Sequence, residues 1–256
     1  MCLILIGARK HPTYKLVIAA NRDEFYERPT APAAFWDDAP GLLAGRDLRA
    51  GGTWLGITTN GRIAAITNYR DPASRKSNAP SRGKLVSDFL LGKESPVDYL
   101  ARLEQRAGRY NGFNLIVGHK DEFCWFSNRG DGSEEIAPGI HGLSNRLLNT
   151  PWPKVTRGKD VLARILSEEK SGLTDALFEM LADRSVAEAT HLPDTGVGTE
   201  WEKILSPIFI ASPVYGTRSS TVVLVDQKGN VIFIETTFHS DTGKDAVVRH
   251  EFKIAD

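Results

Sequence analysis

The chain has 256 residues, of which 41 % are hydrophobic, and its 32 lysine and arginine residues balance 32 aspartate and glutamate residues. This length and hydrophobic content suffice for one sizeable core, and the absence of repeats and low-complexity linkers predicts a single domain over residues 1–256. The zero formal net charge gives no general attraction to nucleic acid or to an anionic membrane, so neither is an expected partner.

The first part of the chain is predicted to form strands. In chain order, the expected elements are a hairpin of strands 3–6 and 15–18, a long loop over 28–40 that carries Phe35 and Trp36, a polar, glycine-rich stretch without strand alternation at 46–52, and a hairpin of strands 53–58 and 62–67. The richness of 28–40 in proline and alanine favours a loop, and long loops are usually functional or mobile. Asn60-Gly61 is the strongest short hairpin signal.

Helices and further strands follow. In chain order, the expected elements are helices over about 85–90 and 97–103, a hairpin of strands 113–118 and 123–127 with Asp121-Glu122 at its turn, a short segment that ends at 142–145, a helix over about 155–166, a helix that carries Leu177, Met180 and Leu181, and strands at 208–210, 221–225, 231–236 and 247–254. Gly92 is expected to end the first of these helices, and Pro96 lies near the start of the second. Hairpins interrupted by two helix pairs predict mixed α and β structure with mainly antiparallel pairing.

The segment around Cys2 carries the first chemical signal. Removing Met1 would leave Cys2 as the first residue, with a thiol and a free α-amine on one carbon skeleton. An α-amine titrates near ~7.7–8.0, so it can serve as the base for its own thiol near neutral pH. The alternative is that Cys2 is a small residue beside a start methionine, and retention of Met1 would favour a binding protein over an enzyme.

The polar segment Asn21-Arg22-Asp23-Glu24 carries the second signal. We expect it at or just beyond the end of the second strand, beside Cys2 at the start of the first. Strand alternation sends Arg22 and Asp23 to opposite faces, so one of them is expected to face Cys2. An acid there can hold the α-amine, and an arginine there can lower the thiol pKa. The alternative is a solvated loop with an Arg–Asp pair.

Several short motifs together resemble the NRDE-domain family, also called the transport and Golgi organisation family. They are Cys2, Asn21-Arg22-Asp23-Glu24, and the segments 50–56, 65–70, 142–145 and 215–221 in this order. The resemblance runs along most of the chain. It implies a link to Golgi organisation and secretion and to haem or lipid handling. It also implies an α+β fold of the N-terminal-nucleophile hydrolase type, a four-layer α-β-β-α sandwich of two antiparallel sheets.

A more distant resemblance is to choloylglycine-type amidases, which also begin Met-Cys and carry an Arg/Asp element after the first hairpin. The positions that match are Cys2, Asp23, Asn68, Asn145 and Arg218. Those amidases place the arginine three residues before the aspartate, whereas Arg22 directly precedes Asp23, so Arg218 is the other candidate guanidinium. We expect the five matching residues to converge in one cleft, because each lies at a strand end or turn exit.

Two functions of different classes follow. The first is a cysteine N-terminal-nucleophile amidase, or a close derivative, that cleaves a small apolar acyl amide without a cofactor. In this mechanism the Cys2 thiolate attacks the amide carbonyl of the substrate. The α-amine of Cys2 takes and returns the thiol proton, and Asp23 orients that amine. Asn68 and Asn145 donate hydrogen bonds, one of them to the oxyanion, and Arg218 stabilises the thiolate or the substrate.

The second function is a non-enzymatic carrier for haem or an acyl lipid. A carrier needs an apolar pocket with few polar anchors, and a haem also needs an axial ligand, for which His141 and Cys2 are the candidates. The expected binding residues are Asn21, Arg22, Trp36 and His141.

The remaining signals concern metals and cellular setting. The six histidines form neither an HxxxH pattern nor a cluster with a cysteine, so a structural metal site is not expected. No apolar run approaches the ~18 residues of a membrane span, and the charged, polar residues 9–11 are not those of a signal peptide. Cys2 and Cys124 alone do not make a disulfide framework, so a reducing, cytoplasmic setting is expected.

Overall fold

The structure, a computed structural model, describes residues 2–120, 122–168, 172–238 and 245–255, and these form two antiparallel sheets with helices packed on them. The chain divides into two compact units. Unit 1 consists of Met1–Glu27, Pro138–Ser144 and Leu148–Glu251, and unit 2 of Arg28–Ala137, Asn145–Leu147 and Phe252–Asp256. The α+β class with two antiparallel sheets is confirmed. The single domain over 1–256 and the four-layer stacking of the sheets stay predictions.

The described strands of unit 1 form a sheet in the order β10-β1-β2-β11-β12-β13. They are β1 (Cys2–Ala8), β2 (Tyr14–Phe25), β10 (Gly139–Leu143), β11 (Tyr215–Asp226), β12 (Asn230–Thr237) and β13 (Ala246–Lys253). The hairpins β1–β2 and β11–β12 and the final strand confirm the predictions for these segments. Apolar residues of β1 and β2, such as Leu3 and Val17, are fully buried, because their side chains pack in one hydrophobic cluster of unit 1.

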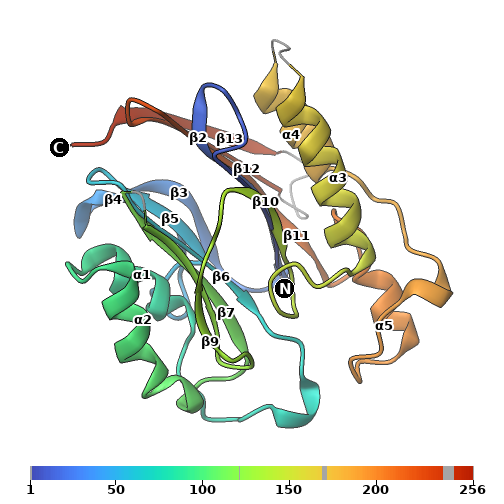
Figure 1. Cartoon of the computed structure of the whole chain (residues 1–256). Coiled ribbons are helices and arrows are strands. Elements are labelled where there is room, and N and C mark those ends of the chain that lie inside the picture. The colour runs from blue at the N-terminus through green and yellow to red at the C-terminus, as the bar shows by residue number, and fades with distance from the viewer. Residues whose placement is uncertain (1, 121, 169–171, 239–244, 256) are drawn as a thin grey trace. The chain divides into compact units, whose positions relative to one another are not determined.

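Helices cover one face of this sheet, as Figure 1 shows. They are α3 (Pro153–Ser167) and α4 (Leu173–Leu181), and a short helix α5 (Thr199–Ile204) follows them in the chain. Leu162 of α3 and Leu177 of α4 pack with Leu3 of β1 in one hydrophobic cluster. The second predicted helix pair is therefore confirmed, with Pro153 in its first turn. α5 has no counterpart among the predictions.

The described strands of unit 2 form a sheet in the order β3-β4-β5-β6-β7-β8-β9. They are β3 (Thr30–Trp36), β4 (Ala39–Asp47), β5 (Leu55–Thr58), β6 (Arg62–Asn68), β7 (Phe113–His119), β8 (Glu122–Ser127) and β9 (Gly132–Glu135). The hairpins β5–β6 and β7–β8 confirm two predictions, and Gly61 takes the positive φ of 82° that its turn requires. Asp121, assigned to the second turn, lies outside the described residues.

Two helices pack on the sheet of unit 2 and confirm the first predicted pair. They are α1 (Gly83–Leu91) and α2 (Pro96–Glu104). Phe89 and Tyr99 meet edge to face between them, with ring centroids 5.2 Å apart. The Tyr99 hydroxyl donates to the Leu85 carbonyl at 2.7 Å, which satisfies its only buried polar group. Gly92 ends α1 and Pro96 begins α2, as predicted.

The predicted loop over 28–40 is wrong, because this segment contains β3 and the start of β4. β3 is an edge strand, and an edge tolerates Pro32, whose missing N–H costs no interior ladder bond. The prediction that residues 46–52 lie outside any strand is also partly wrong, since β4 continues to Asp47. Trp36 lies in the hydrophobic core rather than on a loop, and its Nε1 donates to the Ala44 carbonyl at 3.0 Å.

Two further predictions about strands are wrong. β2 extends to Phe25, so the segment 21–24 lies inside a strand and pairs with β11. Residues 208–210 form no strand, because only Ile210 bonds the main chain of a strand, its carbonyl accepting from the Thr217 N–H of β11 at 2.8 Å, and the Phe209 N–H instead donates to the Asp183 carbonyl at 2.8 Å. The Ile208 carbonyl accepts from the Asn21 amide at 2.9 Å, and the Ile210 N–H donates to the Thr217 hydroxyl at 2.9 Å.

Gly52, which follows β4, lies against the backbone at the start of α1. A Cβ there would come within 2.5 Å of the Gly83 carbonyl carbon, whereas a Cβ at Gly51 would meet nothing within 4 Å. Gly51 has a φ of 74°, which strains any L-residue. We expect Gly52→Ala to lower the free energy of unfolding by roughly 2–3 kcal/mol and Gly51→Ala by about 1 kcal/mol, as measured by urea unfolding. Equal losses would contradict the close backbone contact.

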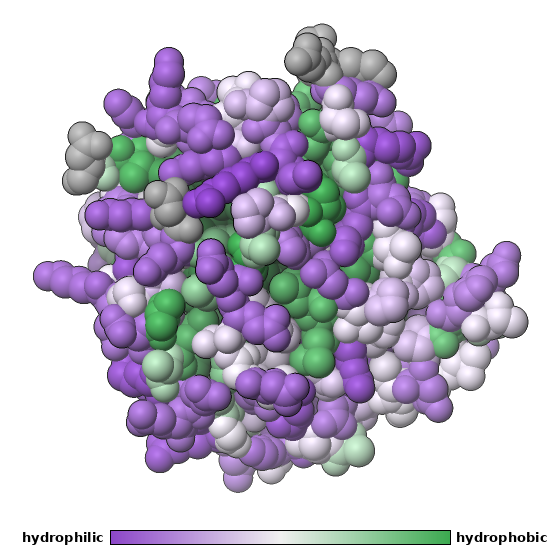
Figure 2. All heavy atoms as spheres, in the orientation of Figure 1, coloured by the Kyte–Doolittle hydropathy of each residue, from purple (hydrophilic) through white to green (hydrophobic). Residues whose placement is uncertain are grey.

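The visible surface mixes hydrophilic and hydrophobic residues. Figure 2 shows hydrophilic side chains over most of this face, with hydrophobic residues in smaller groups between them. None of the helices that the described residues form is long and apolar enough to cross a membrane.

Candidate functional site

Cys2 begins β1, and the register of the first hairpin pairs it with Arg22 on β2. Side chains directly opposite each other in an antiparallel pair lie on the same face of the sheet. Arg22 therefore shares the face of Cys2, while the Asp23 side chain lies on the face that α3 and α4 cover. The main-chain N–H of Asp23 still reaches the thiol and donates a hydrogen bond to it.

Burial raises the pKa of the Cys2 thiol above its usual value, although part of the residue stays exposed. The Asp23 carboxylate adds to this rise in pKa, whereas the Arg22 guanidinium and the Asp23 N–H oppose it. Arg22 thus acts in the expected direction, but burial outweighs it. A thiol with a raised pKa is protonated near neutral pH, so Cys2 needs a base before it can attack.

Asp23 is only 1 % exposed, and hydroxyl groups hold both its carboxylate and its main chain. The Thr217 hydroxyl donates to Asp23 Oδ1 at 2.7 Å, and the Tyr215 hydroxyl donates to the Asp23 carbonyl at 2.9 Å. Burial raises the pKa of the Asp23 carboxyl. The positive charge of Lys154 lowers that pKa, as do the Thr217 hydrogen bond and Arg22. Burial therefore removes the Asp23 carboxylate from water, while Lys154, Thr217 and Arg22 favour its charged form.

The direction of α3 explains how Lys154 comes to this carboxylate. Gly158 of α3 lies against Leu5 of β1, where an added Cβ would come within 2.8 Å of the leucine side chain. Further along both elements, Leu166 lies against Gly7. α3 therefore runs in the same direction as β1, and its first turn, which contains Lys154, lies at the end where β1 begins.

Lys154 is a site residue that the sequence analysis missed. It is the second residue of α3 and only 2 % exposed, so its ammonium group is buried on the same face of the sheet as Asp23. A lysine is seldom fully buried unless it is paired, and its charge is unfavourable in the first turn of a helix. The available signal was Pro153, which favours a helix start two residues before the helix predicted over about 155–166 and so places Lys154 in its first turn.

Two hydroxyl groups were also missed. Thr217 binds the Asp23 carboxylate, and Ser144 at the end of β10 donates to the Cys2 carbonyl at 3.1 Å. Ser144 thereby fixes the start of β1 against β10. Both residues lie within segments that the family resemblance singled out, but the residues themselves carry no local sign of these contacts.

Asn21, an expected binding residue, is held inside unit 1 by three hydrogen bonds. Its Nδ2 donates to the carbonyls of Leu181 at 2.8 Å and Ile208 at 2.9 Å, and its Oδ1 accepts from the Ser220 hydroxyl at 2.6 Å. The side chain is 1 % exposed. These contacts join β2 to the end of α4, and a ligand-binding role for Asn21 stays a prediction.

Arg218 lies in a β-bulge of β11, where the register against β2 shifts between Thr217 and Ser219. A bulge redirects the side chain of the extra residue. Arg218 Nη1 donates to the carbonyls of Phe25 and Tyr26, both at 3.0 Å. It therefore fixes the chain just beyond the end of β2, and its contact with a thiolate or substrate stays a prediction.

The two candidate haem ligands lie apart on neighbouring strands. His141 on β10 is opposite Ile6, which is four residues along β1 from Cys2, a separation of about 13 Å along a strand. Axial ligands flank a single iron, so Cys2 and His141 cannot serve one haem together. The His141 ring has its Nδ1 3.1 Å from the Asn149 amide nitrogen, a contact that orients the ring.

Asn68 and Asn145 meet in unit 2. The Asn145 amide donates to the Asn68 carbonyl at 2.9 Å, and the Asn145 carbonyl accepts from the Arg70 N–H at 2.7 Å. Asn145 is fully buried, whereas Asn68 at the end of β6 is partly exposed. The Asn145 side chain thus contacts the main chain of Asn68, 77 residues away in the sequence.

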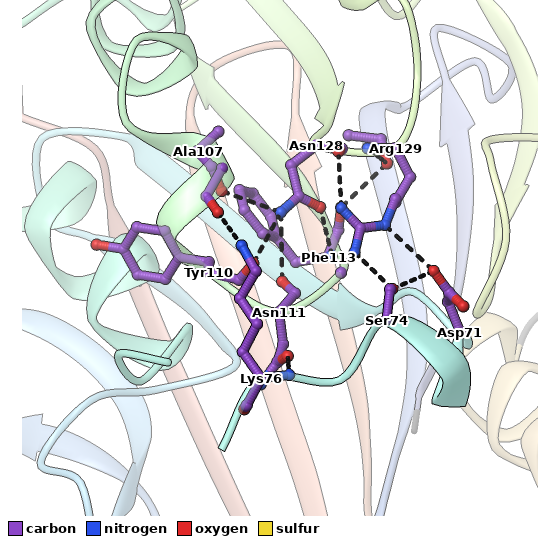
Figure 3. A network of polar contacts seen from close by, with 12 residues as sticks. Asp71, Ser74, Lys76, Ala107, Tyr110, Asn111, Phe113, Asn128 and Arg129 are labelled. Carbon is purple, nitrogen blue, oxygen red and sulfur yellow. Dashed lines mark hydrogen bonds and ion pairs between the residues drawn. The ribbon is translucent and has the colours of Figure 1, made fainter. Parts of the chain in front are cut away.

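A polar network fixes the loops next to this pair (Figure 3). Asn128 Nδ2 donates to the Ala107 carbonyl at 3.1 Å, and its Oδ1 accepts from the Phe113 N–H at 2.9 Å. The Asn111 side chain bonds both the N–H and the carbonyl of Lys76, at 2.7 and 3.0 Å. Asparagine side chains therefore replace backbone pairing here and hold the loop after β6 to the segment before β7.

The five candidate catalytic residues form two groups. In unit 1, Cys2 and Asp23 are in contact and Arg218 lies on the strand beside Asp23; in unit 2, Asn68 and Asn145 are in contact. The convergence of the two groups in one cleft stays a prediction. Within the described ranges, no group of three or more His, Cys, Asp or Glu side chains could hold a metal ion.

Comparison with known proteins gives one family. The family model described as Transport and Golgi organisation 2 matches residues 1–240. The Transport and Golgi organization protein 2 homolog of Bos taurus is 38 % identical and covers 99 % of both chains. The Homo sapiens homolog is 37 % identical over 92 % of both chains, and the Drosophila melanogaster protein is 31 % identical over 93 % of this chain and 92 % of its own.

Solved structures show weaker likeness. A C2A mutant of conjugated bile acid hydrolase from Clostridium perfringens has a TM-score of 0.45 and 9 % identity, over 99 % of this chain and 97 % of the other. The Caenorhabditis elegans ortholog of N-acylethanolamine-hydrolyzing acid amidase has a TM-score of 0.41 and 12 % identity, over 87 % of this chain and 92 % of the other.

Proposed function

The chain belongs to the Transport and Golgi organisation 2 family, and we propose that it is a cysteine hydrolase with Cys2 as its nucleophile. The substrate is a small apolar acyl amide. The reaction takes place in the cytoplasm, where reducing conditions keep thiols free, in keeping with the free state of Cys2 and Cys124.

The proposed reaction needs Cys2 at the N-terminus, so Met1, which lies outside the described residues, is first removed. The α-amine takes the thiol proton, and the thiolate forms a bond to the amide carbonyl carbon. The tetrahedral intermediate then breaks its C–N bond, and the α-amine returns the proton to the leaving amine. Water hydrolyses the resulting thioester, which gives a carboxylic acid and restores the thiol.

The observation that carries the proposal is the contact between Cys2 and Asp23. The Asp23 N–H donates to the thiol, and the Asp23 carboxylate acts on it electrostatically. A carboxylate held in place by Thr217 is suited to orient an α-amine on the same residue as the thiol.

A covalent probe tests the nucleophile. Intact mass first establishes that Met1 is absent, and the protein is then incubated with an electrophilic amide or a β-lactam. We expect one adduct, on Cys2, and none in Cys2→Ala, because Cys124 is only 6 % exposed and burial raises the pKa of its thiol. Peptide mass spectrometry locates the adduct. Processed protein without an adduct on Cys2, or with equal reaction at Cys124, would rule out the assignment.

A carrier for haem or an acyl lipid on the same fold is the second candidate. What favours it is the partly exposed His141 ring, which Asn149 orients and which is of a residue type that can supply an axial ligand. Haem titration, followed by the Soret band, should then show saturable binding that Cys2→Ala leaves unchanged and His141→Ala abolishes. Such binding without any covalent adduct on Cys2 would replace the hydrolase proposal.

A further inference from the structure

We propose that Lys154 is a positioning residue of the Cys2 site, whose buried ammonium group keeps the Asp23 carboxylate charged beside the thiol. The inference rests on the hydrolase function proposed above, because a charged carboxylate is what would orient the α-amine. Its test, however, reads the protonation of Asp23 directly and needs no turnover.

Geometry supports this pairing of Lys154 with Asp23. Both side chains lie on the face of the sheet that α3 and α4 cover, and they are only 2 % and 1 % exposed. The close approaches of α3 to Leu5 and Gly7 fix the first turn of the helix at the end of β1 where Cys2 lies. Lys154 is therefore buried within the same layer as the carboxylate that it affects.

The other groups around Asp23 leave Lys154 as its main cation. Arg22, on the same strand, lies on the opposite face with Cys2. From β11, Thr217 offers a neutral hydroxyl. From β1, the Cys2 thiol would carry a negative charge when it ionises, and this would oppose ionisation of Asp23. Lys154 from α3 gives the strongest charge support to the carboxylate among these side chains.

The chemical consequence concerns the proton that moves during catalysis. A charged Asp23 accepts a hydrogen bond from the α-ammonium group that forms when the amine takes the thiol proton. A neutral Asp23 carboxyl would stabilise that ammonium group less. Burial alone favours the neutral form of a carboxyl group, and the positive charge of Lys154 offsets part of this effect by lowering the pKa of Asp23. Lys154 acts through Asp23 and makes no direct contribution to the bond changes.

Carbon-13 NMR of the full chain labelled at aspartate carboxyl groups tests this. The Asp23 resonance is assigned by its loss in Asp23→Asn, and its titration is compared in wild type, Lys154→Met and Lys154→Arg. We expect a charged Asp23 at pH 7 in wild type and an increase of at least about tenfold in its proton affinity in Lys154→Met, which is one pH unit in midpoint. Lys154→Arg keeps the charge and should stay within about twofold of wild type.

A merely structural lysine would not move this titration. An unchanged Asp23 midpoint in folded Lys154→Met, or a carboxyl already neutral at pH 7 in wild type, would overturn the inference. If Lys154→Met does not fold, Lys154→Gln, which is polar but uncharged, takes its place and is judged by the same midpoint.

Adduct formation at Cys2 gives a second measurement. In processed protein, the acid limb of its pH profile should shift to higher pH together with the Asp23 midpoint. A shifted midpoint without any adduct would support the charge pair and count against the hydrolase.

Discussion

Asn21→Ala is expected to lower the free energy of unfolding by about 3–5 kcal/mol, a severe loss for an uncharged side chain. The substitution removes three buried hydrogen bonds at once. It leaves the carbonyls of Leu181 and Ile208 and the hydroxyl of Ser220 without this partner, in a place that water does not reach. Each stranded group costs roughly 1–3 kcal/mol, and the three costs are not fully additive.

Ser220→Ala is the matched control for this loss. It removes one of the three bonds and leaves the Asn21 amide donors in place, so we expect a loss of about 1–2 kcal/mol. Urea unfolding of both variants, with the slope checked for constancy, measures the two losses. If Asn21→Ala costs no more than Ser220→Ala, the amide is not the link between β2 and α4, and Asn21 becomes available for the binding role expected from the sequence.

Local pattern predicted the elements that bury one continuous apolar face. The helices α1 to α4 stand where apolar residues recur at helical spacing, and the hairpins stand where a short polar turn joins two apolar runs. Ser95 and Pro96 show why the start of α2 was predictable: the serine hydroxyl caps the helix by accepting from the Asp98 N–H, and the proline occupies its first turn.

β3 and β4 escaped prediction because their residues are poor strand formers in isolation. Pro32 interrupts β3, and β4 contains Gly41 and Gly45. Gly45 is required by packing, since a Cβ there would come within 2.2 Å of the Trp54 ring. In such strands tertiary contacts outweigh intrinsic preference, and a composition rich in proline and glycine resembles a loop when read alone.

The candidate site was predictable only as far as the first hairpin reaches. Its short turn fixes the register that brings the segment after residue 20 to Cys2, so Arg22 and Asp23 could be found from the sequence. Lys154 and Thr217 come from distant parts of the chain. Their positions depend on the direction of α3 and on the pairing of β2 with β11, which a local sequence pattern does not specify.

Lys154→Met is expected to cost about 3–5 kcal/mol of unfolding free energy at neutral pH, because it leaves the buried Asp23 carboxylate without its main counter-charge. Proton uptake by Asp23 limits the loss, so the size of the effect depends on pH. Burial already raises the pKa of Asp23 in the folded wild type above the unfolded value, and losing Lys154 raises it further.

The sign of the pH dependence follows from these shifts. Between its unfolded and folded pKa values Asp23 binds more protons in the folded state, so stability falls as pH rises through this interval, by at most about 1.4 kcal/mol per pH unit. The interval is wider in Lys154→Met, so its deficit against wild type should be smallest near pH 4 and grow toward pH 7.5. Urea unfolding across this pH range measures the deficit.

In Lys154→Met/Asp23→Asn the growth of this deficit with pH should vanish, because no carboxylate is left to titrate. A deficit that stays constant with pH, or that is larger in acid, would mean that Lys154 and Asp23 are not coupled.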